Sequence, residues 1–518
     1  MYKRQSIVRV DAQAKYLLLP VEESSPESKL YMIVDNDVVR TFNVRLAVNK
    51  VDYFVPVDLS GYADKHISFN FQLAPESALC WKEMKLSDQF DSSNREKFRP
   101  AYHFSPAWGW MNDPNGMVYK DGEYHLFYQY NPYGSMWGNM HWGHAISKDL
   151  IHWEHQPVAI APDALGTIFS GSCVVDKDNT AGFGVGAIVA FYTSASDRQV
   201  QSMAYSLDNG RTFKKYDRNP ILTSTQRDFR DPKVFWHKES NKWIMVLAVG
   251  QEMQLYSSPN LKDWTYESSF GEGQGAHAGV WECPDLIELP VKGTELKKWV
   301  LICNINPGGP FGGSATQYFV GTFDGKQFVN ESPALTKWMD YGKDHYATVT
   351  WSNAPEDRKI ALAWMSNWEY ANNVPTSQYR SANSVPRDLV LYTKNGQTYL
   401  SSTPSPEVLK LRGKAQKKGS FKVDRSHEVN PILSGNAGTY EIEIKFKNNG
   451  ADIMSFQLFN SKGEEVEMHY NLLDNTFTMD RRNSGATDFS KTFATATSAP
   501  ISAAKEYTLR LLVDNCSI

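Results

Sequence analysis

The chain has 518 residues, with 54 basic and 58 acidic side chains and a formal net charge of −4. Its length predicts two to four domains at roughly 100–200 residues each, and the balanced charge gives no reason to expect a nucleic-acid or anionic-membrane partner. No apolar run approaches the ~18 residues that a transmembrane helix needs, so we expect no membrane span.

The sequence predicts an all-β protein. Short runs of Val, Ile, Tyr, Phe and Trp alternate with turn signals such as Asp121-Gly122, Asn209-Gly210 and Asn395-Gly396, which is typical of strands joined by tight turns. No long segment has the periodicity of an amphipathic helix.

Three domains are expected in chain order. Residues 1–92 hold strand-like stretches and predict a small β domain that ends at a polar hinge. Residues 100–400 are rich in Trp, Gly and Pro. After a basic stretch, residues 415–518 predict a β-sandwich, because 440–447 alternates apolar and polar residues as a half-buried strand does.

The middle domain contains a repeat. Polar motifs begin at Asp113, Ser170, Asp231, Glu282 and Asp344, at intervals of 57, 61, 51 and 62 residues. Units of this length with several short strands each predict a five-bladed β-propeller; the alternative is irregular β structure with chance spacing. In a propeller the inner strand of every blade reaches the central channel, so the five motifs would converge on one pocket.

Four of these motifs carry a carboxylate, and several carboxylates in one pocket indicate either a metal site or acid/base catalysis. Metal sites usually add His or more Asp ligands, and His345 is the only histidine near a motif. We therefore expect no metal. Acid/base catalysis instead needs carboxyl groups in unlike environments, one ionised and one protonated.

The neighbours of three carboxylates suggest such a division. Asn112 can donate to Asp113 and keep its pKa low, and the Arg230 guanidinium should keep Asp231 ionised. Glu282 has an apolar ring and a thiol beside it, which suits a proton donor. Each motif alone is also typical of a turn or a structural ion pair, so the argument depends on the set at blade-like spacing.

The motifs resemble those of glycoside hydrolase family 32, the β-fructosidases. The segments that carry the resemblance are WMNDPNG at 110–116, RDP at 230–232 and ECP at 282–284, with further matches at 128–132, 169–172 and 384–389. It covers about residues 100–518 and implies a five-bladed propeller followed by a β-sandwich. His345 departs from the family, which often has Phe there. Residues 1–92 are similar to an extra β domain of some gut-bacterial fructanases.

The resemblance implies a retaining glycosidase without a cofactor. Asp113 would be the nucleophile that attacks C2 of a β-fructofuranosyl unit, Glu282 the acid and then the base, and Asp231 the stabiliser of the transition state. In retaining sites the two carboxyl groups lie roughly 5–5.5 Å apart. The residues that would bind the terminal fructose are Asn112, Gln129, Trp137, Phe169, Ser170, Arg230, Asp344 and Trp368.

The implied substrates are fructans (levan or inulin) and sucrose, cleaved from the chain end. A fructosyltransferase on the same scaffold and a non-catalytic fructan-binding protein are alternatives, although the latter would be expected to lack Asp113 or Glu282. WMNDPNG and ECP argue against related arabinan-type hydrolases. The preference for β-2,1 or β-2,6 linkages and the oligomeric state stay open.

Three further expectations concern the ends of the chain. We expect an extracytoplasmic location, periplasmic or secreted, in a bacterium, although no signal peptide is visible. Residues 512–518 resemble the start of a strand that normally continues, so the sandwich is expected to be truncated. For the N-terminal domain both carbohydrate binding and packing are open, and packing is favoured because no aromatic platform is obvious.

Overall fold

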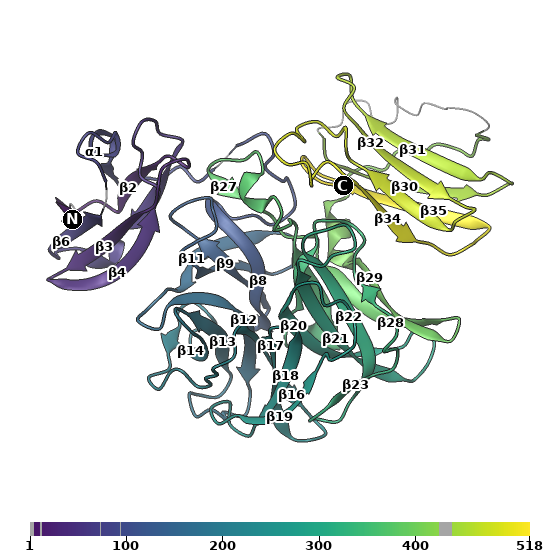
Figure 1. Ribbon diagram of the computed structural model, residues 1–518, viewed down its shortest axis with the longest axis horizontal. Coiled ribbons are helices and arrows are strands. Elements are labelled where there is room, and N and C mark those ends of the chain that lie inside the picture. The colour runs from purple at the N-terminus through teal and green to yellow at the C-terminus, as the bar shows by residue number, and fades with distance from the viewer. Residues whose placement is uncertain (1–4, 11–12, 73, 94, 424–437) are drawn as a thin grey trace.

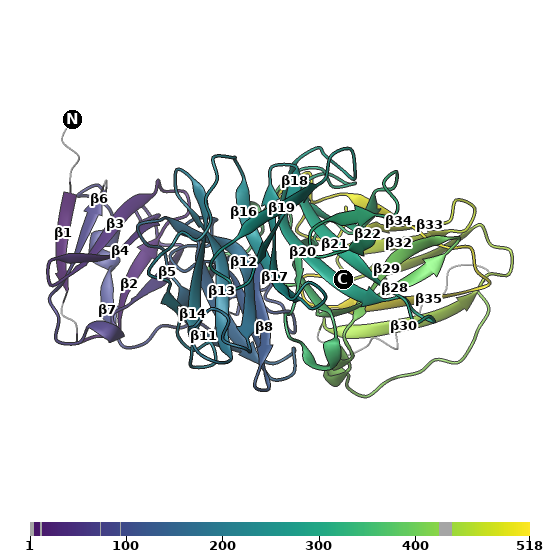
Figure 2. The ribbon, with the colours of Figure 1, turned by 90° about the horizontal axis from the view of Figure 1, so that it is seen from below.

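The computed structural model describes residues 5–10, 13–72, 74–93, 95–423 and 438–518. The chain folds into an N-terminal domain, a propeller and a C-terminal sandwich, with the two smaller parts at opposite ends of the long axis (Figures 1 and 2). The predicted all-β fold, a propeller followed by a sandwich, is confirmed. None of the helices in the described residues is long and apolar enough to cross a bilayer.

The N-terminal domain packs two antiparallel sheets against each other, in the orders β1-β6-β3-β4 and β5-β2-β7 within its described residues. Along β3 the buried residues Leu30, Met32 and Val34 alternate with more exposed ones, as a strand with one face in a core requires. The elements are β1 (Gln5–Val10), β2 (Tyr16–Val21), β3 (Ser28–Val34), β4 (Asp37–Val44), β5 (Tyr53–Asp58), η1 (Ser60–Tyr62), β6 (Ile67–Gln72), α1 (Cys80–Glu83) and β7 (Lys85–Ser87).

Five antiparallel blades form the propeller in residues 109–404, all of which are described. Their inner strands contact one another in a closed ring and so surround one channel. In ring order these are β8 (Gly109–Lys120), β12 (Thr167–Asp176), β16 (Phe229–His237), β20 (Val280–Pro290) and β25 (Tyr346–Thr350).

The outer strands of each blade follow in sequence order. They are β9 (Glu123–Asn131), β10 (His141–Ser147) and β11 (Trp153–Ile160); β13 (Ala187–Ala195), β14 (Gln199–Ser206) and β15 (Lys214–Lys215); β17 (Lys242–Val249), β18 (Glu252–Ser258) and β19 (Thr265–Phe270); β21 (Lys297–Asn306), β22 (Ala315–Phe323) and β23 (Phe328–Asn330); and β26 (Ile360–Trp364), β28 (Arg387–Lys394) and β29 (Gln397–Pro404). The short pieces are β24 (Lys337–Trp338), β27 (Tyr379–Arg380), η2 (Pro355–Asp357), η3 (Ala371–Asn373) and η4 (Pro406–Leu411).

Hydrogen bonds between the first and fifth blades close the ring. Tyr119 N donates to Ser352 O at 2.9 Å, and Ser352 N donates to Met117 O at 2.9 Å. The Trp351 indole adds a bond from Nε1 to His125 O at 3.0 Å. The ring is therefore held by main-chain pairing as well as by apolar packing between blades.

Near its start, each of the five inner strands is interrupted by a β-bulge at one of the five sequence motifs. The register shifts fall between Met111 and Pro114, Ile168 and Gly171, Arg230 and Lys233, Glu282 and Asp285, and Tyr346 and Val349. Three bulge residues have positive φ, namely Asp231 (64°), Cys283 (42°) and Ala347 (53°), a conformation that residues other than Gly rarely adopt. Bulges redirect side chains, so a similar distortion in each inner strand can turn a side chain of each motif toward the channel.

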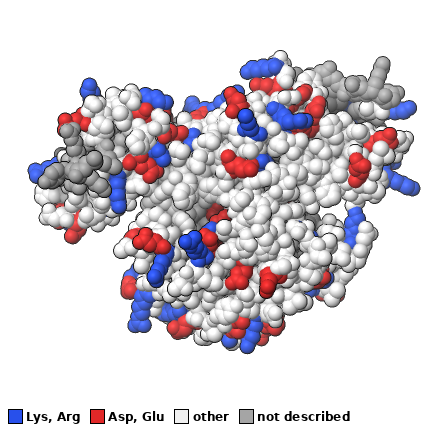
Figure 3. Space-filling view, viewed as in Figure 1, with Lys and Arg blue, Asp and Glu red and all other residues white. Residues whose placement is uncertain are grey.

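The sandwich pairs β30 with β35 and packs them against a four-stranded sheet, β31-β32-β33-β34, within residues 438–518. Asp514 fastens it to the segment before the propeller, because its carboxylate accepts from Ala101 N (2.8 Å) and His103 Nδ1 (2.8 Å). On the face in Figure 3, acidic and basic side chains are interspersed. The strands are β30 (Tyr440–Lys447), β31 (Ile453–Phe459), β32 (Glu465–Asn471), β33 (Thr476–Asp480), β34 (Ala496–Pro500) and β35 (Glu506–Val513).

Candidate active site

Three carboxyl groups from three blades meet around one cysteine. Asp113 lies on β8, Asp231 on β16 and Glu282 on β20. Cys283 Sγ lies 3.4 Å from Asp113 Oδ2 and 3.5 Å from Asp231 Oδ2, and the Cys283 N–H donates to Asp231 Oδ2 at 2.8 Å. The structure thus brings together the three carboxylates that the sequence singled out.

The Asp113 carboxylate is held by two side chains. Trp110 Nε1 donates to Asn112 Oδ1 at 2.8 Å, which turns the Asn112 amide nitrogen toward Asp113 Oδ1 at 3.0 Å. Ser170 Oγ, from the second blade, donates to Asp113 Oδ2 at 2.6 Å. The orientation of Asp113 is therefore fixed by contacts within its own strand and from the neighbouring blade.

Ser170 is in turn supported from within the propeller. With its amide oxygen facing Gln129 Nε2 (3.0 Å), buried Asn115 donates to Ser170 Oγ at 3.2 Å. Gln129 is only 2% exposed and also donates to Ile168 O at 2.9 Å. Gln129 is thus linked to Asp113 by hydrogen bonds through Asn115 and Ser170. Sequence reasoning assigned no role to Asn115, although this residue belongs to the WMNDPNG segment.

Both oxygens of Glu282 are engaged. Arg230 donates to Oε1 from Nε (3.1 Å) and Nη2 (2.9 Å), and Tyr346 OH donates to Oε2. Arg230 is itself anchored by Asp228, whose Oδ1 accepts from Nη1 at 2.6 Å. The predicted pairing of Arg230 with Asp231 is thus replaced by direct hydrogen bonds to Glu282. Sequence reasoning assigned no role to Tyr346, although it belongs to the motif that begins at Asp344 and stands at the fifth bulge.

Burial dominates the titration of the two aspartates. Desolvation raises the pKa of Asp113 against its hydrogen bonds from Ser170 and Asn112, and the nearby Glu282 carboxyl raises it further. Desolvation likewise raises the pKa of Asp231 to about 7, although Arg230 acts in the opposite direction. The expectation of a low pKa at Asp113 and of a firmly ionised Asp231 is therefore wrong. Because burial disfavours the charged form of both aspartates, this part of the site retains a proton to higher pH than an exposed aspartate would.

An aromatic wall stands beside the carboxylates. Trp137 is 45% exposed, and its ring centroid lies 6.3 Å from that of Phe169 and 6.5 Å from that of Trp368. Trp368 stacks on Trp110, with 5.8 Å between centroids and 25° between planes. Because Trp110 also holds Asn112, the wall is continuous with the support of Asp113. An exposed indole at such a rim suits the apolar face of a sugar ring.

Asp344, expected among the binding residues, is engaged at the border with the sandwich. Its Oδ1 accepts from Tyr370 OH at 2.6 Å, and its Oδ2 accepts from Arg481 Nη1 of the sandwich. Arg481 Nη2 also donates to Tyr370 OH at 2.9 Å. With both oxygens occupied by protein groups, Asp344 is better suited to joining two domains than to binding a ligand.

The site adjoins a small cavity lined from all five blades, by Asn115, Ser170, Asp231, Cys283 and Thr350 among others. In the part of the chain that the structure describes, no three His, Cys, Asp or Glu side chains are grouped so as to hold a metal ion. The site contains three carboxyl groups in different surroundings. Neutral donors orient Asp113, a guanidinium and a phenol hold Glu282, and a backbone N–H fixes Asp231. These groups are suited to nucleophilic and acid/base chemistry on a bound sugar.

Family models match nearly the whole chain. The model described as glycosyl hydrolases family 32 N-terminal domain matches residues 103–404, and that described as glycosyl hydrolases family 32 C terminal matches 407–518. Residues 3–102 match a domain of unknown function, DUF4980.

Characterised proteins are similar over most of the chain. A levanase of Bacillus subtilis strain 168 is 48% identical over 445 residues, a match covering 83% of this chain and 66% of the levanase. An extracellular exo-inulinase of Aspergillus awamori is 38% identical over 473 residues, covering 83% and 88%.

Solved structures give the same result. The crystal structure of exo-inulinase from Aspergillus awamori aligns with a TM-score of 0.75 at 36% identity, covering 81% of this chain and 90% of that chain. The β-fructofuranosidase of Schwanniomyces occidentalis complexed with fructosyl-erythritol aligns with a TM-score of 0.74 at 36% identity, covering 82% and 90%.

Proposed function

Since the chain belongs to glycoside hydrolase family 32 and is a glycosidase of the β-fructosidase type, we propose that it releases terminal β-D-fructofuranosyl units from fructans and sucrose with retention of configuration. The observation that carries this proposal is the placement of Asp113 and Glu282 in unlike hydrogen-bond settings around one cysteine. The relatives named levanase, exo-inulinase and invertase support the substrate class.

In the first step Asp113 is the nucleophile. Its carboxylate, oriented by Asn112 and Ser170, attacks C2 of the terminal fructosyl unit and forms a covalent ester. The bond from C2 to the leaving oxygen breaks, and Glu282 gives that oxygen its proton. Arg230 and Tyr346 hold Glu282 in place and stabilise the carboxylate that remains.

In the second step Glu282 acts as a base. It takes a proton from a water molecule as the water oxygen attacks C2, and the bond between C2 and Asp113 breaks. Two displacements at one carbon retain its configuration. Asp231, fixed by the Cys283 N–H, accepts hydrogen bonds from ring hydroxyls and, in its ionised form, stabilises the positive charge that develops on the ring.

Product analysis tests this function. We expect chromatography of separate digests of sucrose, inulin and levan to show free fructose from the earliest time points. Early accumulation of longer oligosaccharides would indicate internal cleavage and contradict the proposal. At high sucrose concentration, oligosaccharides longer than the substrate would instead identify a fructosyltransferase. Because several similar exo-inulinases are named extracellular, we also propose an extracytoplasmic location.

Replacing the active-site thiol is expected to move one limb of the pH profile. The Cys283 thiol lowers the pKa of Asp113 against the larger effect of burial, so Cys283→Ala removes a donor and raises that pKa further. Because Asp113 acts in its ionised form, the acid limb of kcat/KM should shift to higher pH, by up to about one unit. Cys303→Ala, at a buried cysteine of β21, is the control and should leave this limb in place. An unmoved or downward-shifted limb in Cys283→Ala would contradict this role.

A further inference from the structure

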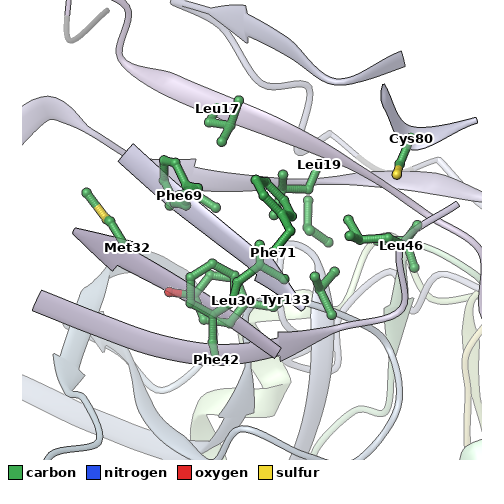
Figure 4. Packing of buried hydrophobic residues seen from close by; sticks show 14 of the residues in the cluster. Leu17, Leu19, Leu30, Met32, Phe42, Leu46, Phe69, Phe71, Cys80 and Tyr133 are labelled. Atoms are coloured by element: carbon green, nitrogen blue, oxygen red, sulfur yellow. The ribbon is translucent and has the colours of Figure 1, made fainter. Parts of the chain in front are cut away.

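The loop between β9 and β10, residues 132–140, joins the propeller to the N-terminal domain. Tyr133 of this loop is buried and belongs to the hydrophobic core of that domain. Its ring stacks on Phe42 of β4, with 3.9 Å between centroids and 18° between planes. Figure 4 shows Tyr133 beside Phe42 and Leu30 in this core. A propeller loop thus completes the core of the neighbouring domain.

Hydrogen bonds fix the same loop at two further points. The Ser135 N–H donates to Tyr53 OH at 2.9 Å, in buried surroundings. The Asn139 side chain pairs with the main chain of Asn43, accepting from its N–H and donating to its carbonyl, both at 2.8 Å. These contacts lie on both sides of Trp137 in the sequence.

Two propeller residues complete the support. Arg380, which is 5% exposed, donates from Nη1 to Ser135 O (3.0 Å) and from Nη2 to Glu23 Oε2 of the N-terminal domain (2.9 Å). The Trp137 N–H donates to Asn372 Oδ1 at 3.0 Å. The backbone around Trp137 is thereby held, while its indole projects toward Phe169 and Trp368 at the rim of the site.

We propose that the N-terminal domain is a positioning element of the sugar pocket. Through Phe42, Asn43 and Tyr53 it holds the 132–140 loop so that the Trp137 indole is oriented before substrate arrives. A loop ordered in advance costs less to bind against than one ordered by the ligand. This inference rests on the proposed function for the statement that Trp137 contacts sugar, and it gives the domain a role beyond packing.

Two conservative variants test the kinetic consequence. Tyr53→Phe removes only the hydroxyl that accepts from Ser135, and Phe42→Leu removes the ring that stacks on Tyr133. Because Trp137 lies at the rim, its contacts should be similar in the ground and transition states, so KM for sucrose and levan should rise with kcat little changed. The loss of one hydrogen bond or ring contact predicts a rise of about three- to tenfold.

A double-mutant cycle separates positioning from general destabilisation. In a Trp137→Ala background, Tyr53→Phe should leave KM unchanged, because the indole that it positions is gone. Phe69→Leu, in the same core on β6, is the matched control and should lower the melting temperature without changing KM. The proposal is overturned if KM stays constant in both Tyr53→Phe and Phe42→Leu, or if the rise persists without Trp137.

Hydrogen exchange tests positioning without substrate. In the full-length, ligand-free protein, amides in a peptide spanning 131–140 should exchange faster in Tyr53→Phe and Phe42→Leu than in the wild type or in Phe69→Leu. Equal exchange in all four proteins would overturn the positioning role whatever the activity. Absence of fructose release by the wild type would instead contradict the proposed function, so the two failures are distinguishable.

Discussion

Asp113→Asn is expected to lower the turnover of sucrose and fructans by at least about 10²-fold. An amide cannot supply the oxygen nucleophile that forms the ester at C2. It keeps the size of the carboxylate and can still accept from Asn112, so the fold should be preserved. Initial rates and circular dichroism of the purified variant provide the test.

One control variant and one stability measurement accompany Asp113→Asn. Asp121→Asn lies in the turn after the same strand, where the carboxylate is 69% exposed and pairs with Lys120, and it should retain full activity.

The pKa of Asp113 is raised in the folded protein. At pH values above the ordinary Asp range, the native state therefore binds more protons than the unfolded state, and the stability of the wild type falls as pH rises through that range. The melting temperature of Asp113→Asn should therefore exceed that of the wild type by more at pH 8 than at pH 5. Near-wild-type turnover in this variant would refute the nucleophile assignment.

Glu282→Gln should lose about 10²- to 10⁴-fold on sucrose, because the sugar leaving group needs a proton that glutamine cannot give. An aryl β-D-fructofuranoside with an acidic phenol needs no such help, so formation of its covalent intermediate should be largely preserved. The second step then becomes limiting, since water lacks its base. Added azide, an anion that requires no base, should restore turnover and yield β-fructosyl azide.

Glu288→Gln provides the matched control on the same strand. Its carboxylate is 37% exposed and pairs with Lys297, so the variant should behave as wild type on both substrates. Equal losses by Glu282→Gln on sucrose and on the aryl fructoside would argue against an acid role. An azide product of α configuration would contradict retention.

The number of blades could be predicted from the sequence because one polar motif occurs in each blade, at intervals of about one blade length. The structure explains why: each motif occupies the bulge of an inner strand. The contact of Tyr346 with Glu282 could not be read in the same way, because a tyrosine at the start of a strand is equally typical of core packing. The pairing of Asp344 with Arg481 spans two domains and 137 residues, and no local pattern reports such a contact.

The titration of the aspartates also lay beyond sequence reasoning. Sequence reasoning identified one neighbour that lowers the pKa of Asp113, because Asn112 does donate to it, but not Ser170 or Cys283. What decides the direction is desolvation, which depends on all the atoms that surround a carboxyl group in three dimensions. The link between Tyr133 and the core of the N-terminal domain is likewise a product of tertiary packing.

The bulge that recurs in every inner strand has a consequence for how such a protein evolves. One backbone distortion presents an aspartate at Asp113, a hydroxyl at Ser170, a second aspartate at Asp231, a glutamate at Glu282 and a phenol at Tyr346. Because the distortion is shared while the side chains differ, duplication of an ancestral blade would deliver each new copy to the same channel. Mutations at the bulges can then change the chemistry of the site, whereas mutations of the apolar residues between blades are tolerated only if the propeller still folds into a closed ring. Trp110, Cys283 and Tyr346 are constrained in both ways, because they support the carboxylates and also belong to a buried apolar cluster.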